Sequence, residues 1–319
     1  MPLIGFHASH EQIAPSKLLE AVKLAESAGF DAAMCSDHFA PWGADQGHSG
    51  FAWSWLGAAL ASTSLSFGIV NAPGQRYHPA IIAQAAATLG EMFPNRFWAA
   101  LGSGEALNEH ITGEAWPVKE VRNARLAECV AVMRALFRGE TVTHDGLVRV
   151  DRAKLWTRPQ TPTPLIAAAV STETAAWAGE WADGLITINQ PHEHLRRMIA
   201  AFREGGGEGK PVYLQIHLSI APTESEALAI AHRQWRTNVF ASSLAWNLEL
   251  PEQFDEAAKF VEPEQLRKNV LIASDPARFA GWLSDFAALG FDGLYLHHVG
   301  QEQRLFIETF GQHVLPQLR

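Results

Sequence analysis

Cysteines, basic residues and long apolar runs are all scarce in this sequence of 319 residues, and each shortage excludes a class of protein. Only Cys35 and Cys129 are present, and both lie in apolar or helical patterns. We therefore expect two buried thiols in a reducing cytoplasm, not a disulfide framework. Lys and Arg number 25 against 34 Asp and Glu, for a formal net charge of -9. Binding to a nucleic-acid backbone needs a basic surface, so the sequence predicts no nucleic-acid partner.

Targeting and membrane segments are also missing from the pattern. The first residues, 1–6, have neither the basic flank nor the apolar core of a secretion signal. No apolar stretch approaches the length of about 20 residues that crosses a bilayer. The sequence thus predicts a soluble, cytoplasmic protein with no membrane partner.

Short strand-like runs alternate with longer helical patterns along the chain, as in repeated β-α-β units. Helices are expected at 17–28, 79–92 and 121–138. Eight runs are predicted as strands: 3–6, 31–35, 65–69, 97–101, 165–168, 184–187, 212–217 and 293–296. Eight strands close a (β/α)8 TIM barrel, which is our predicted fold, and an open doubly wound sheet is the alternative.

Nothing in the composition divides the chain, so we predict one domain over residues 1–319 with two insertions. A hairpin is expected near 140–151, where Asp145-Gly146 interrupts alternating apolar residues. The irregular stretch 240–263 is expected to be a long excursion over one face, as a lid or a wall of the substrate pocket.

Acid and base side chains follow two of the predicted strands. The segments are Ser36-Asp37-His38-Phe39-Ala40-Pro41-Trp42 and Gly102-Ser103-Gly104-Glu105-Ala106-Leu107-Asn108-Glu109. Residues that follow the strands of a barrel meet at one rim, so we expect these side chains to share a pocket. His38 can exchange a proton near neutral pH, and Trp42 offers an apolar plane. The alternative is that Asp37 and His38 make only turn and capping hydrogen bonds.

Two further segments contain residue types that bind phosphate or metal. Val170, Ser171 and Thr172 join a predicted strand to a helix, where backbone N–H groups and hydroxyls can receive a phosphate. On these residues alone, a simple helix N-cap is the favoured alternative. His297 and His298 are adjacent on a strand and point to opposite sides, so no metal site is predicted.

At these motifs the chain resembles the luciferase-like flavin and deazaflavin oxidoreductases, and within them the F420-dependent glucose-6-phosphate dehydrogenase branch. The resemblance runs nearly from end to end and includes residues 8–12, 76–79 and 272–276. It implies a (β/α)8 barrel with insertions, of the bacterial luciferase type. It also implies a homodimer, and a flavin-like ring at the carboxyl-terminal rim of the strands.

The resemblance also implies residue roles. His38 would be the base that takes a hydroxyl proton, Trp42 would line the reacting face, and Glu105 would be the acid near the N1 region of the ring. Contacts with the cofactor fall on Asp37, Ile69, Val70, Asn71, Ser103, Gly104, Asn108, Val170, Ser171 and Thr172. Positions of the substrate pocket are Glu11, Asn189 and Trp246. A non-proline cis peptide bond is expected within 69–71.

The sequence departs from that branch in both halves of the predicted site. Three cations that bind the sugar phosphate are replaced by Pro191, Ala245 and Asn269. A phosphate dianion would lose its charge-assisted contacts, so glucose 6-phosphate is not the expected substrate. Trp246 stands at a histidine position, which indicates a more apolar pocket. Val170-Ser171 replaces a Gly-Gly pair, as in a subgroup of flavin oxidoreductases that do not use F420.

These observations predict an FMN-dependent oxidoreductase of the luciferase-like monooxygenase class. Its expected substrate is small, uncharged and partly apolar. The first alternative is an F420-dependent alcohol or sugar dehydrogenase, or a reductase, with His38 as the base; the retained Glu105 favours it. The alternative from another class is a flavin-binding protein without turnover.

Overall fold

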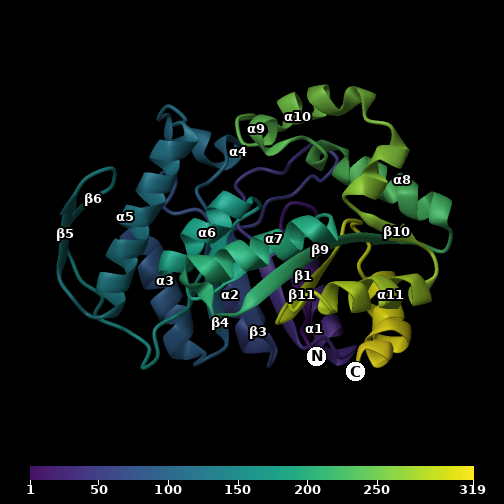
Figure 1. Ribbon diagram of the computed structural model, residues 1–319, viewed down its shortest axis with the longest axis horizontal. Helices are drawn as coiled ribbons and strands as arrows, with labels where there is room; N and C mark the ends of the chain where they lie inside the picture. Colours follow the sequence, from purple (N-terminus) through teal and green to yellow (C-terminus); the bar gives the residue numbers. More distant parts are fainter.

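Eight parallel strands close into a barrel in the computed structural model, which describes residues 1–319 (Figure 1). The barrel strands are β1 (Leu3–Ala8), β2 (Ala32–Ser36), β3 (Ser66–Asn71), β4 (Phe97–Leu101), β7 (Leu165–Ala168), β8 (Leu185–Ile188), β9 (Val212–Ile220) and β11 (Gly293–His298). Pairing of β8 with β9 and of β11 with β1 closes the ring, so the predicted TIM barrel is confirmed over the open sheet.

Helices surround the barrel, and the largest apolar core lies between them and the strands (Figure 1). They are α1 (Pro15–Ser27), α2 (Ala52–Ser62), α3 (Pro79–Met92), α4 (Ala106–Glu109), α5 (Lys119–Phe137), α6 (Thr172–Trp181), α7 (His192–Phe202), α8 (Glu224–Trp235), α9 (Ser242–Ala245), α10 (Pro251–Ala257), α11 (Pro276–Ala287) and α12 (Arg304–Thr309). Helix α3 begins at Pro79, which suits the first helical turn because proline has no N–H to leave unpaired. No helix combines the length and the apolar character that crossing a membrane requires.

Two segments interrupt the strand-helix alternation of the barrel. Strands β5 (Val142–Asp145) and β6 (Arg149–Ala153) form the antiparallel hairpin. The excursion carries α9 and α10 and crosses the carboxyl-terminal end of the barrel near α4 (Figure 1). The N–H of Ala106 donates to the carbonyl of Trp246 at 3.0 Å, which ties the excursion to the start of α4. A short strand, β10 (Leu271–Ala273), pairs with the end of β9.

Three aromatic rings fill the interior of the barrel near the amino-terminal ends of the strands. Trp98 stacks on Tyr213 with ring centroids 5.3 Å apart, and Tyr295 packs edge-on against both. Gly5 and Gly68 make room for them: a Cβ at Gly5 would lie 2.3 Å from the Tyr295 ring, and one at Gly68 would lie 2.0 Å from Trp98. This aromatic layer is the aromatic plug. It closes the barrel at the amino-terminal ends of the strands, so inward side chains nearer the carboxyl-terminal ends face a cavity.

Candidate active site

The cavity at the carboxyl-terminal rim has two adjoining chambers. We call the first, of about 230 Å³, the acidic chamber because Asp37, Glu105 and Glu109 line it. The second, of about 450 Å³, is the imidazole chamber, lined by His7, His217 and His297. Seven residues line both and form the junction: His38, Val70, Glu105, Val170, Ile188, Gln215 and Trp246.

In the acidic chamber, Asp37 is held by a buried hydrogen-bond network. Its carboxylate accepts from Asn71 Nδ2 at 2.8 Å and from the Tyr77 hydroxyl at 3.4 Å. Arg76 Nη2 donates to the Asp37 carbonyl at 2.8 Å and lies 3.5 Å from the carboxylate. With the Asn71 amide thus oriented, its buried Oδ1 has no partner in the protein. Asn71 therefore presents the free acceptor at this end of the chamber.

Glu109 is the second buried carboxyl here. Its Oε2 accepts from the Arg76 backbone N–H at 2.6 Å, and its Oε1 lies 3.6 Å from Arg76 Nε. Burial raises the pKa of Glu109 to about 7, although the hydrogen bond and the charge of Arg76 both act to lower it. The carboxyl thus changes its protonation state near neutral pH.

A strip of backbone without large side chains lines the chamber at Gly102, Ser103 and Gly104. Gly104 has φ +86°, a left-handed conformation that favours glycine, and a Cβ there would lie 3.2 Å from the Trp116 ring. Glu105 follows, and burial raises its pKa against the opposing charge of His38. The strip thus offers peptide groups and one buried carboxyl to a flat ligand.

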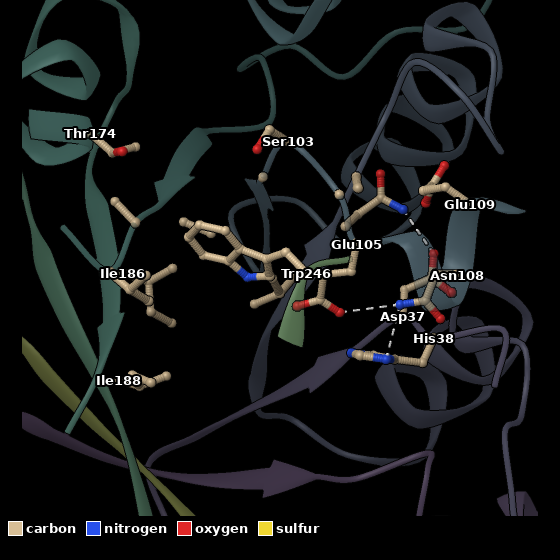
Figure 2. A pocket seen from close by; sticks show the side chains of 18 of the residues that line it. Asp37, His38, Ser103, Glu105, Asn108, Glu109, Thr174, Ile186, Ile188 and Trp246 are labelled. Atoms are coloured by element: carbon tan, nitrogen blue, oxygen red, sulfur yellow. Dashed lines mark hydrogen bonds between the residues drawn. The ribbon is translucent and has the colours of Figure 1, made fainter. Parts of the chain in front are cut away.

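Asn108 fixes the orientation of His38. The Phe39 N–H donates to Asn108 Oδ1 at 2.8 Å, so the amide nitrogen faces His38 Nδ1 at 3.1 Å and Glu105 at 3.4 Å (Figure 2). Because an amide N–H can only donate, His38 Nδ1 is an acceptor and Nε2 carries the proton. A hydrogen bond between Asp37 and His38 is absent; His38 pairs with Asn108 and Glu11 instead.

Glu11 lies beside the protonated nitrogen of His38, with 3.2 Å between Oε1 and Nε2. Its oxygens also accept from the hydroxyls of Ser36 at 2.5 Å and Ser9 at 2.9 Å. Burial by itself would raise the pKa of Glu11, but the charge of His38 and the bond from Ser36 outweigh it and bring the pKa to about 2. The Glu11–His38 pair therefore holds an ionised carboxylate at the boundary of both chambers.

Two tryptophans stand beside this pair. The Trp42 ring lies 5.2 Å from His38 and rests edge-on against Phe254 of the excursion. Trp246, also from the excursion, is drawn in Figure 2 between the wall of Ile186 and Ile188 and the wall of Glu105 and His38. Apolar rings here exclude water from the junction and offer flat surfaces to a ligand.

The structure brings most of the predicted site residues together. The junction contains His38, Val70, Glu105, Val170 and Trp246; the acidic chamber adds Asp37, Asn71, Ser103, Gly104 and Asn108; the imidazole chamber adds Glu11, Trp42 and Asn189. The positions of the lost cations, Pro191, Ala245 and Asn269, all line the imidazole chamber.

Three predicted residues lie outside the lining. Ile69 is fully buried in the core, because its side chain points outward from the barrel. Ser171 is the N-cap of α6 and accepts from the Thr174 N–H, as the alternative interpretation expected, and Thr172 follows it. Thr174, two residues further, lines the acidic chamber instead. The expected cis peptide bond at 69–71 is absent, since every peptide bond is trans.

Sequence reasoning missed several lining residues. Arg76 was noted only as part of a motif, and Glu109 only as the end of one. The inward-facing side chains His7, Gln215, His217 and His297 were also missed. Their signal was a polar residue at every second position near the end of a predicted strand, which places it inside the barrel.

Comparisons with known proteins agree with this architecture. The family described as luciferase-like monooxygenase matches residues 3–293. The F420-dependent glucose-6-phosphate dehydrogenase of Mycolicibacterium smegmatis is 36% identical over 328 residues, covering 99% of this chain and 98% of that protein. The enzyme of the same name from Beutenbergia cavernae is 35% identical over 327 residues, covering 99% and 97%.

A solved structure is also similar over its whole length. An F420-dependent secondary alcohol dehydrogenase, in complex with an F420-acetone adduct, superimposes with a TM-score of 0.93 at 31% identity and covers 100% of both chains. The family match and these full-length relatives together show that the chain is an oxidoreductase of the luciferase-like monooxygenase family.

Proposed function

We propose that this protein is an F420-dependent dehydrogenase that moves a hydride between a hydroxyl-bearing substrate in the imidazole chamber and a deazaflavin ring in the acidic chamber. The observation that carries the proposal is the Glu11–His38 pair at the junction of the two chambers. A base at this place serves the oxidation of an alcohol, which must lose a proton from oxygen as it loses a hydride from carbon. The full-length relatives with F420 in their names support the same cofactor.

The acidic chamber fits a deazaflavin ring. The unpartnered Asn71 Oδ1 can accept from a ring N–H, and the strip at Gly102–Gly104 lets a flat group approach the backbone. Burial raises the pKa of Glu105 and so favours its protonated form, in which the carboxyl donates to a ring acceptor. At the other end, Lys119, Asn123 and Thr174 offer one cation and two polar groups to a phosphate and its tail.

When bound, F420 supplies an acceptor or donor of hydride. The chain supplies proton handling: Asn108 orients His38 so that Nε2–H faces Glu11, and during oxidation Nε2 takes the hydroxyl proton as its own proton passes to Glu11. Sequence reasoning assigned this step to His38 alone. Ionised Glu11 next to Nε2 makes the two groups act as one unit, because the carboxylate stabilises a second proton on the pair. In the reductive direction the same pair returns the proton.

FMN, the cofactor that the sequence analysis favoured, is the second candidate here. The observation on its side is the hydroxyl-bearing start of α6, where Ser171 and Thr174 lie 3.1 Å apart through their oxygens. A phosphate at a helix start gains from such donors. Monooxygenase activity, the homodimer and the cytoplasmic location stay predictions.

The test is a pair of titrations of the cofactor-free protein with F420 and with FMN, followed by anaerobic addition of alcohols. We expect F420 to bind at least about tenfold more tightly than FMN and to be reduced by an alcohol. Tighter FMN binding with oxygen consumption would assign the monooxygenase function instead. Binding of neither ring would overturn both proposals.

A variant that blocks the acidic chamber tests where the ring binds, and a surface variant of the same type is its control. Gly102→Leu places a side chain in the acidic chamber, since a Cβ there has open space up to Ala168 at 3.8 Å, and should abolish ring binding. Gly281→Leu lies on the exposed face of α11, where a Cβ meets nothing within 4 Å, and should leave binding unchanged. Equal binding by the two variants would place the ring elsewhere.

A further inference from the structure

The floor of the imidazole chamber is made by strand residues just above the aromatic plug. His7 on β1, Gln215 on β9 and His297 on β11 each lie two residues beyond an inward-facing plug or glycine position, and His217 lies two residues beyond Gln215. Alternation along a strand therefore turns all four side chains into the barrel. The His7 and His297 rings lie 4.3 Å apart, and those of His217 and His297 lie 5.3 Å apart.

Hydrogen bonds determine which floor atoms are free. Gln12 Nε2 donates to the Val299 carbonyl, so Gln12 Oε1 accepts from His297 Nε2 at 2.8 Å. His297 Nδ1 must then be an acceptor, and it receives Gln215 Nε2 at 3.3 Å. The same amide nitrogen lies 3.2 Å from His217 Nε2. Both N–H groups of Gln215 are used, and its Oε1 is left as an acceptor with no partner in the protein.

The upper walls repeat this surplus of acceptors. The amide nitrogen of Asn269 donates to the Asn238 carbonyl, that of Asn238 to Thr237, and that of Gln190 to Val170. No protein donor reaches the side-chain oxygen of any of these three amides. Together with the oxygen of Gln215, these three make four amide oxygens that can accept hydrogen bonds from ligand groups.

The chamber is otherwise nearly neutral. Burial lowers the pKa of His7 to about 4 and of His217 to about 3, and it takes the pKa of His297 well below its ordinary value. A neutral imidazole has no positive charge with which to form an ion pair with an anion. Glu11 is ionised and repels one, and Lys268 at the exposed edge is the single lysine or arginine of the lining.

We propose that the substrate is an uncharged polyhydroxylated compound, such as a free sugar or a cyclic polyol. Four unpartnered amide oxygens match several hydroxyl donors, and leaving them unpaired against an apolar alcohol costs free energy. Trp42, Trp235 and Trp246 provide flat faces on which the C–H face of a ring packs. The substrate proposed here is more polar than the partly apolar one predicted from the sequence, and both are uncharged.

The turnover of such a compound rests on the proposed function. One ring carbon would lose its hydride to the bound cofactor, its hydroxyl would lose a proton to His38 Nε2 as the Nε2 proton passes to Glu11, and a carbonyl would form. The other hydroxyls keep their hydrogen bonds to the amide oxygens throughout. No oxygen or further reductant is needed, because the two electrons leave with the hydride.

Binding to the cofactor-free protein tests the inference separately from turnover. Calorimetry would compare myo-inositol with cyclohexanol, which differ in hydroxyls, and glucose with glucose 6-phosphate, which differ in the phosphate. We expect the polyol and the free sugar to bind about tenfold more tightly than their partners. Tighter binding of glucose 6-phosphate or cyclohexanol, or no binding of any, would overturn the inference.

Substitutions test whether the polyol binds at the floor of the imidazole chamber. Gln215→Leu should weaken myo-inositol about tenfold and leave cyclohexanol within about twofold, while Gln84→Leu on the exposed face of α3 should change neither. If the floor variant does not fold, Asn238→Ala on the upper wall should weaken the polyol in the same direction. Equal losses for polyol and cyclohexanol would contradict the role of the amide oxygens.

Anaerobic F420 reduction then separates the two proposals. Polyol binding without reduction of F420 would remove the proposed function and leave the binding site. Reduction by cyclohexanol but not by any polyol would leave the dehydrogenase and remove the polyol.

Discussion

The acidic and imidazole chambers share a junction but are built in different ways. Most of the acidic chamber comes from short continuous segments after β2, β3 and β4, and its charged groups bind one another. The imidazole chamber has a floor of single residues on β1, β9 and β11 and walls from the segment 188–191, the excursion and other separate segments, and its histidines are held neutral by burial.

The two chambers differ in which hydrogen-bond acceptors are left without a protein partner. In the acidic chamber Asp37 and Asn108 have protein partners, while Asn71 Oδ1 and Glu109 Oε1 are buried without a hydrogen-bond partner. Such a network is rigid and suits one ring in one orientation. In the imidazole chamber several amide oxygens are free, which suits recognition of a ligand with many hydroxyls. The chain thus pairs a fixed ring site with an open, hydroxyl-binding site.

The largest expected effect is at the junction where the chambers meet. His38→Ala should lower kcat by about a thousandfold, because it removes the proton-handling ring while leaving the groups that hold the cofactor. Steady-state rates and F420 titration would measure the two quantities. His48→Ala, an exposed histidine outside both chambers, is the matched control and should leave both unchanged.

The same junction tests whether Glu11 and His38 act as a unit. Glu11→Gln should lower kcat by about a hundredfold, and the double variant should be no slower than His38→Ala alone. Additive losses would mean that the two residues act independently, and the junction would then contain two separate groups. Glu20→Gln, an exposed glutamate on α1, controls for the loss of one charge.

The second effect is on the free energy of unfolding, to which titrating groups in the two chambers contribute with opposite pH dependence. The histidines of the imidazole chamber have folded pKa values below the ordinary 6.5, so their contribution is present above pH 6.5 and is lost as the pH falls toward about 4. Glu109 has a folded pKa of about 7, raised from 4.5, so its contribution is full below pH 4.5 and is lost as the pH rises through 7.

Glu109→Gln isolates the acidic chamber, because the histidines cancel when variant and parent are compared. The glutamine keeps an oxygen for the Arg76 N–H but does not titrate. From about pH 5.5 to about pH 7.5, the free energy of unfolding of the variant should gain about 2 kcal/mol relative to the parent. Urea denaturation at both pH values measures it, with exposed Glu91→Gln as control. A difference that does not change with pH would show that Glu109 does not titrate in this range.

The two chambers also differ in how far the sequence predicted them. Strand-helix alternation predicted the barrel and its rim, and with it a shared pocket for Asp37, His38 and Glu105; the position of Asn108 followed only from the family resemblance. Their spacing along the chain follows the spacing of the strands. The pairing of Arg76 with Glu109 could not be predicted, because it joins the loop after β3 to helix α4, and their distance depends on how β3 and β4 pack.

The imidazole floor was hidden for another physical reason. His7 and His297 alternate with apolar residues on buried strands, and whether such a residue faces helices or the barrel interior depends on register. Their lack of charge follows from burial, which a sequence does not show. The tryptophan at position 246 suggested an apolar pocket, yet the amides around it come from segments far apart in the chain.

The smallest expected effect sharpens the boundary of the acidic chamber at its phosphate end. Thr174→Val keeps the backbone N–H that Ser171 caps and removes a hydroxyl that lines the chamber, so F420 should bind about fivefold more weakly. Thr172→Val, which alters a hydroxyl outside the lining, should change the Kd by less than about twofold. Fluorescence titration of the two variants gives both values. If Thr172→Val has the larger effect, the phosphate lies at the residues predicted from the sequence, and the acidic chamber extends past the turn that begins α6.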